Sequence, residues 1–228
     1  MSMNKEKVKK NFNTVAKGYD RLKTQIIPRY REVEKLMQSY ILLPRNTRAR
    51  ILELGTGTGQ WASRILKRFP NAHYNGVDFS ENMLSLASHN LRCYADRVNL
   101  QNLDLNRATL TGRYDLIYSS FALHHIEDKQ KFFKMIHKLL KRKGRFLYID
   151  VTSAHSRNLE KLFMESWKNF MRNSACPNNR LRKVITDHLE NDIPETVENQ
   201  LQFLQSAGYK NYELIWRFEK FAAFYAQK

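Results

Sequence analysis

The sequence predicts a doubly wound α/β fold, in which a seven-stranded, mostly parallel sheet carries helices on both faces. Between residues 49 and 155, short apolar runs alternate with amphipathic stretches, which is the pattern of strands joined by crossover helices. A glycine-rich turn, residues 55–59, follows the first apolar run. Near the C-terminus two more strands are separated by only Glu219 and Lys220, a link that allows only an antiparallel hairpin.

The expected strands are apolar runs that end in polar or small residues. The first run leads through the glycine turn into an amphipathic helix over 60–69. After the second, Ser80 has the side chain of a helix N-cap, and a third helix is expected over 128–141. The parallel strands are expected at 49–54, 73–77, 98–103, 114–118 and 145–151, and the hairpin strands at 212–218 and 221–226.

The chain is long enough for one domain with a substantial hydrophobic core. Two regions fall outside the alternation of strands and helices, and both look helical. Because ligands of open α/β sheets bind beyond the carboxyl ends of the strands, extra helices there are natural lids. We therefore expect a single domain with an N-terminal helical lid, a cofactor-binding core, a helical insertion over the active site and a closing hairpin, over 1–48, 49–155, 156–207 and 208–228.

Charge is the unusual bulk property, with 39 Lys and Arg against 22 Asp and Glu and a formal net charge of +17. Residues 1–50 contain 13 of the basic and 4 of the acidic side chains, so the excess is concentrated toward the N-terminus. Such a field raises the local concentration of anions, from nucleic acid to an anionic small molecule. It also simply solubilises a small protein and stabilises helix C-termini, so both interpretations stay open.

Several classes of protein are disfavoured by the same inspection. Cys93 and Cys176 form no Cys-x-x-Cys pair, and the seven histidines show no metal-ligand spacing, so no metal site is expected. Apolar stretches are far shorter than a bilayer requires, and the N-terminus lacks the apolar core of a secretory signal. We expect a cytoplasmic protein without a membrane span, as a monomer or a homodimer.

The glycine turn and an acidic residue point to a nucleoside-containing ligand. Glycines allow the backbone to approach a ligand closely, but their spacing at 55, 57 and 59 differs from Gly-x-Gly-x-x-Gly, which disfavours a hydride-transfer cofactor. Asp78 ends the second strand, 19 residues after Gly59, where a carboxylate can accept from both hydroxyls of a ribose. The alternative role for Asp78 is as an anion at the start of the helix that Ser80 caps.

The chain resembles the class I S-adenosylmethionine-dependent methyltransferases over nearly its whole length, and within them a ubiquinone- and menaquinone-methyltransferase-like branch that acts on small molecules. The Rossmann-like fold of that family agrees with the elements above. Further similar segments are 12–20 with Ala16, Tyr19 and Asp20, the stretch 139–145 and the late turn 204–209. The motifs that carry the resemblance are Ile51-Leu52-Glu53-Leu54-Gly55-Thr56-Gly57-Thr58-Gly59, Gly76-Val77-Asp78-Phe79-Ser80-Glu81-Asn82-Met83-Leu84, Asn102-Leu103-Asp104-Leu105, and Tyr114-Asp115-Leu116-Ile117 with Phe121-Ala122-Leu123-His124-His125-Ile126.

The resemblance implies S-adenosylmethionine as cofactor, with S-adenosylhomocysteine as product. It implies that the first motif holds the methionine portion and that Glu53 orders the ammonium group. Asp78 would hold the ribose, Phe79 and Met83 would flank the adenine, although Met83 also fits ordinary core packing, and Asp104 would face the adenine amino group. The implied cofactor residues are Glu53, Gly55, Thr56, Gly57, Gly59, Asp78, Phe79, Met83, Asp104, Leu105 and Ser120.

The methyl acceptor is less defined. Tyr19 is expected to close over the cofactor, and His124 or its neighbour His125 to transfer a proton, unless the pair only packs at a helix start. No Asn-Pro-Pro-Tyr type motif follows the fourth strand, which leaves oxygen, carbon, sulfur and other nitrogen acceptors open. A small acceptor is favoured, the alternatives being a tRNA or rRNA acceptor, suggested by the charge, and a noncatalytic binding scaffold. Candidates for the acceptor pocket are Tyr19, His124, Phe163, Trp167 and Phe170.

Overall fold

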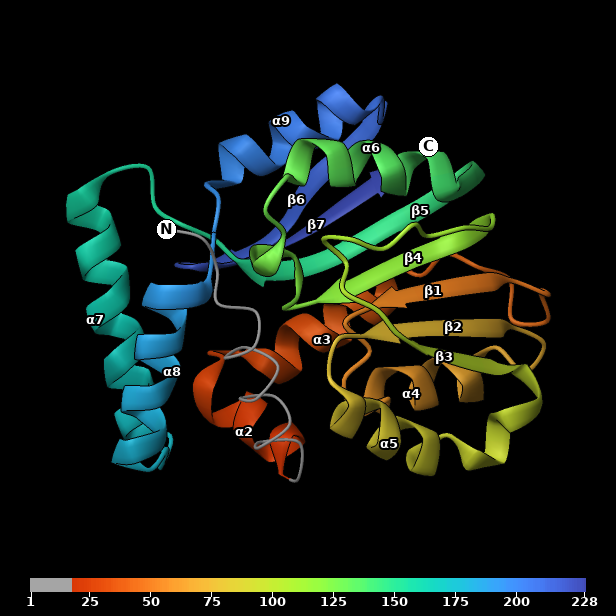
Figure 1. Ribbon diagram of the computed structural model, residues 1–228. Helices are drawn as coiled ribbons and strands as arrows, with labels where there is room; N and C mark the ends of the chain where they lie inside the picture. The colour runs from red at the N-terminus through yellow and green to blue at the C-terminus, as the bar shows by residue number, and fades with distance from the viewer. Residues whose placement is uncertain (1–17) are drawn as a thin grey trace.

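The computed structural model describes residues 18–228, so the part of the expected N-terminal motif that includes Phe12 and Ala16 lies outside the described residues. Seven strands form one sheet in the order β3-β2-β1-β4-β5-β7-β6 (Figure 1). Neighbouring strands from β3 to β5 are parallel, while β7 is antiparallel to both β5 and β6. The predicted fold class is confirmed.

The elements follow the predicted alternation closely. The strands are β1 (Arg50–Leu54), β2 (His73–Asp78), β3 (Val98–Asn102), β4 (Tyr114–Ser120), β5 (Leu140–Val151), β6 (Asn211–Phe218) and β7 (Phe221–Gln227). The α-helices are α2 (Tyr19–Ile26), α3 (Tyr30–Ser39), α4 (Gln60–Arg68), α5 (Glu81–Asn90), α6 (Lys129–Leu139), α7 (Arg157–Asn173), α8 (Asn178–Asn191) and α9 (Val197–Ala207). Short 3₁₀ segments lie at Arg92–Arg97 and Leu123–His125.

Both faces of the sheet are buried because successive side chains of a strand point to opposite sides. In β1, Leu52 and Leu54 belong to the apolar cluster under α6 and α9, whereas Ile51 belongs to the cluster under α3 and α4. Figure 1 shows these helix layers above and below the sheet. Ser80 caps α5 as predicted, since its Oγ accepts from the backbone N–H of Met83 at 3.2 Å. The core therefore holds β1 and the turn that follows it in a fixed position.

Three helices stand beyond the carboxyl ends of the strands rather than on a face of the sheet. Helices α2, α7 and α8 lie to the left of the strand tips in Figure 1. They share an apolar cluster that includes Ile27, Trp167, Leu181 and Phe221. Within 156–207, only α7 and α8 occupy this place, because α9 returns to the sheet and packs beside α6. The helical segments 19–39 and 156–207 are interrupted near Pro28, Pro177 and Pro194.

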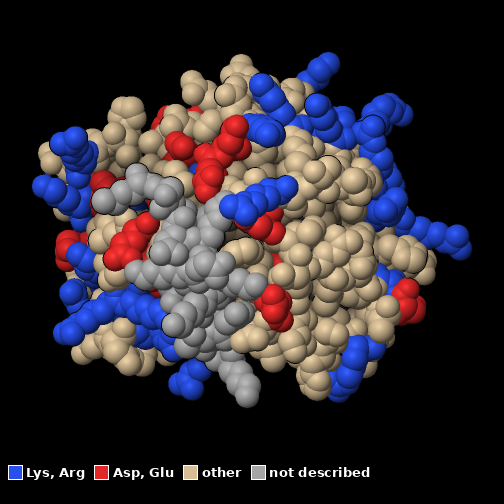
Figure 2. Space-filling model, viewed as in Figure 1, with Lys and Arg blue, Asp and Glu red and all other residues tan. Residues whose placement is uncertain are grey.

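Basic side chains on the face shown in Figure 2 gather mainly at two places, the upper right edge, where α6 ends and β5 begins, and the outer side of α7 and α8. The first includes Lys138, Lys141, Arg142 and Lys143, near the amino ends of the strands.

Within the described chain, no helix combines the length and apolar character that crossing a membrane would require.

Candidate active site

The glycine turn after β1 is held by the end of β2. The backbone N–H groups of Gly55 and Thr56 both donate to the Val77 carbonyl, at 2.9 and 3.0 Å. The carboxylate of Asp78 accepts from the N–H of Gly57 at 2.8 Å and from the N–H of Ser80 at 2.9 Å. Burial raises the pKa of Asp78, although these backbone hydrogen bonds favour its charged form. Asp78 therefore joins the turn to the start of α5, in addition to lining the cavity beside it.

The glycines of the turn are required for different reasons. Gly55, with φ of 74°, would place a Cβ 2.6 Å from the Cβ of Ala122, so it permits β1 and the segment after β4 to approach closely. Gly57, with φ of 54°, has nothing within 4 Å of the position of a Cβ. Its missing side chain leaves open space next to the cavity, which is what a bound ligand needs. Gly59 is not among the residues that line the cavity, and a Cβ there would lie 3.0 to 3.2 Å from Leu91 and Ala87.

A cavity of about 1020 Å³ opens between this turn, the ends of β2 and β4 and helix α2. All of the predicted cofactor residues other than Gly59 line it: Glu53, Gly55, Thr56, Gly57, Asp78, Phe79, Met83, Asp104, Leu105 and Ser120. Donors, carboxylates and an apolar slot are thus present together, as a molecule with an amino acid, a ribose and an adenine requires.

Glu53 is a buried carboxyl group on the floor of this cavity. Burial raises its pKa to about 8, even though hydroxyl groups of Tyr74 and Thr56 donate to Oε2 and favour the charged form. A carboxyl group with this pKa is mostly neutral at pH 7 and becomes charged when a cation enters beside it. This is the behaviour expected of a group that receives an ammonium ion.

Helix α2 closes the cavity from the side opposite the sheet. The hydroxyl of Thr58 donates to both carboxylate oxygens of Asp20 at 3.0 Å, so the helix is fastened to the glycine turn. Tyr19 lines the cavity as predicted, and burial, aided by Asp78 and Asp20, raises the pKa of its phenol. Lys23 also lines it, 3.0 Å from Asp20. Sequence reasoning missed Lys23, because one lysine in a basic N-terminal region gives no signal.

The adjoining wall of the cavity includes an aromatic pair that the sequence motifs did not indicate. The rings of Trp61, in α4, and Tyr118, in β4, stack with their planes 1° apart and their centroids at 3.8 Å. Both are buried, and their separation of 57 positions in sequence hides the contact. The pair gives the cavity a rigid apolar side.

A second cavity, of about 910 Å³, adjoins the first beneath α2, α7 and α8. The two share the lining residues Tyr19, Phe121 and His125, so they meet at these side chains. Phe121 has φ of 55°, an uncommon conformation for a residue with a side chain, and strained residues of this kind cluster at active sites. Apolar walls from Ile26, Ile27, Val151, Trp167 and Phe221 face the basic residues Arg180 and Lys183 of α8.

Three of the five residues predicted for an acceptor pocket line this second cavity, namely Tyr19, His124 and Trp167. Phe163 and Phe170 lie outside the lining. The ring of Phe163 lies 5.9 Å from the guanidinium of Arg217, and Phe170 packs against the apolar cluster of α7 and α8. The helical spacing of Phe163 and Phe170 therefore reflects packing of α7, which is what such spacing most often indicates.

The two adjacent histidines have different environments. His124 is buried, and its Nδ1 pairs with the fully buried carboxylate of Asp150, which sequence reasoning did not identify. Burial alone would lower the pKa of His124, but Asp150 and Asp192 outweigh it and raise the pKa to about 9. Burial, together with the neighbouring His124, lowers the pKa of His125 to about 4. Only His125 lines both cavities, whereas His124, the residue predicted to transfer a proton, lines the second.

Comparison with known proteins agrees with this site. A family model described as "Methyltransferase domain" matches residues 52–146. The carboxy-S-adenosyl-L-methionine synthase of Nautilia profundicola is 25% identical over 217 residues, 94% of this chain and 92% of the relative. The malonyl-[acyl-carrier protein] O-methyltransferase of Bacillus cytotoxicus is 29% identical over 167 residues, 71% of this chain and 55% of that protein.

Among solved structures, phosphoethanolamine N-methyltransferase 2 of Haemonchus contortus, in complex with S-adenosyl-L-methionine, superposes with a TM-score of 0.68. The superposition covers 95% of this chain and 57% of that one at 17% identity, so it shows a shared fold. The chain therefore spans little more than half of this structure and of the Bacillus relative, but nearly all of the Nautilia relative.

None of these three proteins is named as a quinone methyltransferase, so they lend no support to that expected branch. Each of the three is named for S-adenosyl-L-methionine or for methyl transfer. The domain match covers the strands β1 to β4 and the turns after them, and the sheet is mostly parallel with a C-terminal antiparallel hairpin, as the sequence predicts. The chain has the class I fold, and together with the domain match and the curated relatives this identifies it as an S-adenosylmethionine-dependent methyltransferase.

Proposed function

We propose that this enzyme methylates a small anionic acceptor that binds in the second cavity. The observation that carries the proposal is that the two cavities meet at Tyr19, Phe121 and His125. A ligand in the second cavity therefore reaches the cofactor only past these three side chains. Residues 1–48 and helices α7 and α8 are proposed as the lid that encloses the acceptor.

The walls of the second cavity indicate the chemistry of its ligand. Its lining is mainly apolar, and the aromatic rings of Phe121, Trp167 and Phe221 suit a carbon skeleton. Arg180 and Lys183 supply positive charge on one side, which favours a carboxylate or phosphate at one end of the acceptor. Asp187 and Asp192, from the same helix and the residue after it, also border the cavity, so the anionic group of the acceptor is expected to lie nearer Arg180 and Lys183.

S-adenosylmethionine supplies an activated methyl group on a sulfonium, and the protein mainly has to position the acceptor. Orientation of two reactants can supply roughly 7 to 11 kcal/mol of barrier reduction. Tyr19 and His125 are the polar side chains common to both cavities, so they are placed to contact the acceptor atom. The hydrogen bonds from Thr58 to Asp20 hold α2, the helix that begins at Tyr19, against the glycine turn.

The test is a screen of small carboxylates and phosphates for release of S-adenosylhomocysteine. With an accepted compound, Arg180→Ala should raise KM about tenfold or more with little change in kcat, because an ionic hydrogen bond to bound acceptor is worth about 1.5 to 3 kcal/mol. Arg182→Ala, one position from the basic pair and outside the cavity lining, is the matched control. An equal KM for both variants would contradict the proposed acceptor position.

A second candidate is favoured by the nearly full-length similarity to a carboxy-S-adenosyl-L-methionine synthase. In that case the cofactor itself would be the molecule modified, and Arg180 and Lys183 would hold a carboxylate-bearing co-substrate. Mass spectrometry of every reaction in the screen, whether or not S-adenosylhomocysteine is released, separates the two candidates. A carboxylated form of S-adenosylmethionine supports the second, whereas a methylated acceptor with S-adenosylhomocysteine supports the first.

The third possibility, an RNA acceptor, depends on the net charge of +17. Binding of RNA through phosphates would weaken steeply with salt, in proportion to the number of phosphates contacted. Tight, strongly salt-dependent binding of tRNA with no turnover of small acids would support this alternative. Weak, salt-insensitive binding would support the small acceptor.

A further inference from the structure

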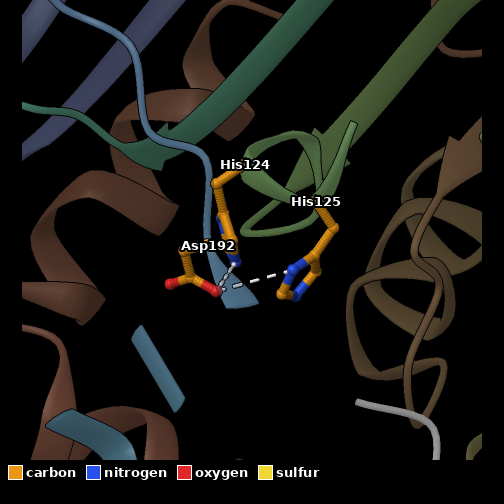
Figure 3. Close-up of side chains that lie close together, drawn as sticks. All are labelled: His124, His125 and Asp192. Atoms are coloured by element: carbon orange, nitrogen blue, oxygen red, sulfur yellow. Dashed lines mark ion pairs between the residues drawn. The ribbon is translucent and has the colours of Figure 1, made fainter. Parts of the chain in front are cut away.

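Two histidines and an aspartate converge at the wall of the second cavity (Figure 3). His124 and His125 come from the 3₁₀ turn after β4, and Asp192 follows the last residue of α8. The Nε2 of His124 lies 3.7 Å from Oδ1 of Asp192, and the Nδ1 of His125 lies 3.5 Å from the same oxygen. One ligand atom from each residue lies within 4.8 Å of the other two.

These separations suit a metal ion. Imidazole nitrogens and carboxylate oxygens bind Zn²⁺ at about 2.0 to 2.2 Å, so two ligands of a tetrahedral ion lie about 3.4 Å apart. The two distances to Asp192 exceed this value by 0.1 to 0.3 Å, and all three ligand atoms lie within 4.8 Å of one another. Closure around an ion therefore needs the side chains to move together by about an ångström or less.

Outer contacts orient two of the three groups. His124 pairs through Nδ1 with the buried Asp150, which leaves Nε2 directed toward Asp192. The second oxygen of Asp192, Oδ2, accepts from Nδ1 of His188 at 2.7 Å. Metal-bound histidines nearly always have their other ring nitrogen held by a carboxylate or carbonyl in this manner, which fixes the ring and its tautomer.

We propose that His124, His125 and Asp192 bind a divalent first-row transition metal ion, of the kind of Zn²⁺, Fe²⁺ or Co²⁺. Two imidazoles and one carboxylate suit these ions, whereas Mg²⁺ and Ca²⁺ prefer sites made of oxygen. The carboxylates of Asp150 and Asp192 make the place attractive to a cation. The sequence predicts no metal site because the carboxylate is 67 positions from the histidines and only the fold brings it to them.

Three protein ligands leave at least one coordination position of a tetrahedral ion open. All three residues line the second cavity, so an oxygen atom of a molecule bound there can occupy this position. A metal-bound hydroxyl group loses its proton more readily than a free one, which would prepare an oxygen acceptor for methylation. This role of the metal in methyl transfer rests on the proposed function, whereas the binding of the metal by the three side chains does not.

The experiment titrates Co²⁺ into the full-length protein after treatment with a chelator, with no cofactor or acceptor present. Wild type should bind one Co²⁺ per chain with visible absorption bands, and Zn²⁺ should displace it. Asp192→Asn and His125→Gln should each weaken Co²⁺ binding by more than about 100-fold. The reason is that loss of a residue that only orients a metal ligand already lowers metal affinity by about 10- to 100-fold. Asp150→Asn, which loosens the ring of His124, should weaken it by about 10- to 100-fold.

The matched control is His73→Gln, which removes an exposed histidine at the start of β2 and should leave affinity and stoichiometry unchanged. Thermal unfolding of each variant shows whether it is folded. X-ray absorption of the cobalt-loaded wild type, which needs no variant, should show imidazole and carboxylate ligands. Failure of wild type to bind Co²⁺ at micromolar concentration, or equal binding by wild type and folded Asp192→Asn, would overturn the site. If the protein binds no Co²⁺ and still transfers methyl groups in excess chelator, the proposed metal site is wrong and the proposed function stands.

Discussion

Binding of the cofactor product at pH 7 should release close to one proton, and Glu53 is the residue that loses it. Burial raises the pKa of this carboxyl group to about 8. A pKa one unit above the pH leaves about ten neutral groups for each charged one, so about nine in ten chains carry a neutral Glu53 at pH 7. If Glu53 receives the ammonium group of S-adenosylhomocysteine, the complex stabilises the charged carboxylate, and the proton leaves.

The magnitude follows from the same pKa. The expected release is about 0.9 proton per bound ligand at pH 7 and about 0.1 at pH 9, where Glu53 is already charged. Because ionising a group one unit below its pKa costs about 1.4 kcal/mol, this residue makes binding about tenfold weaker at pH 7 than at pH 9. The contribution of Glu53 to the affinity for S-adenosylhomocysteine therefore increases as the pH rises through 8.

Isothermal titration in two buffers with different heats of ionisation measures the number of protons directly. Glu53→Gln should lower the release at pH 7 by about 0.9, and comparison with this variant removes any contribution from Asp78, whose pKa is also raised by burial. Glu34→Gln, which alters another carboxylate of the cavity that pairs with Arg64, is the matched control and should release as many protons as wild type. Equal release by wild type and Glu53→Gln would refute the assignment of the ammonium site.

Four further outcomes are expected. Asp78→Ala should weaken binding of S-adenosylhomocysteine by about 1.5 to 3 kcal/mol in a calorimetric titration, and unchanged affinity would contradict a ribose contact. Gly57→Val should nearly abolish that binding, because the branched side chain enters open space next to the cavity at φ of 54°; a fully active variant would sink the cofactor site. Asp20→Ala, which frees α2 from Thr58, should raise KM for the cofactor by about fivefold, equivalent to about 1 kcal/mol, with Arg21→Ala as control. His125→Gln should lower kcat by about 10²- to 10⁴-fold in single-turnover assays if the residue contacts the acceptor atom, and an undiminished rate would exclude that contact.

The cofactor half of the site could be predicted because its signals are local. Gly55, Gly57 and Asp78 stand where predicted strands end, and parallel strands bring those ends to one edge of the sheet. Even so, a motif does not separate the roles of its members. Gly59 belongs to the same run of glycines, but its missing side chain allows close packing against α5 rather than contact with the cavity.

The acceptor half could be predicted only as a region. The second cavity is formed by α2, α7 and α8, which meet through an apolar cluster, and no residue spacing records that meeting. Asp150 reads in the sequence as the polar end of a strand, and Asp192 as a residue after a helix, yet both lie against His124. The start of β5 is a smaller example, since Leu140 was expected in a helix but is buried beside Tyr114 as a strand partner.

The position of the methyl transfer follows from the strand order. In this sheet the chain runs outward in one direction from β1 to β3 and in the other from β4, so the switch of direction lies between β1 and β4. Gly55 at the end of β1 touches Ala122 after β4, and the next residues of that segment, Leu123–His125, form the turn that carries both histidines. The cofactor residues lie mainly at the ends of β1, β2 and β3, whereas the second cavity takes residues from the segments after β4 and β5. With the acceptor in the second cavity, as we propose, cofactor and acceptor approach from opposite sides of the switch, and Phe121 and His125, which line both cavities, lie on the path of the methyl group.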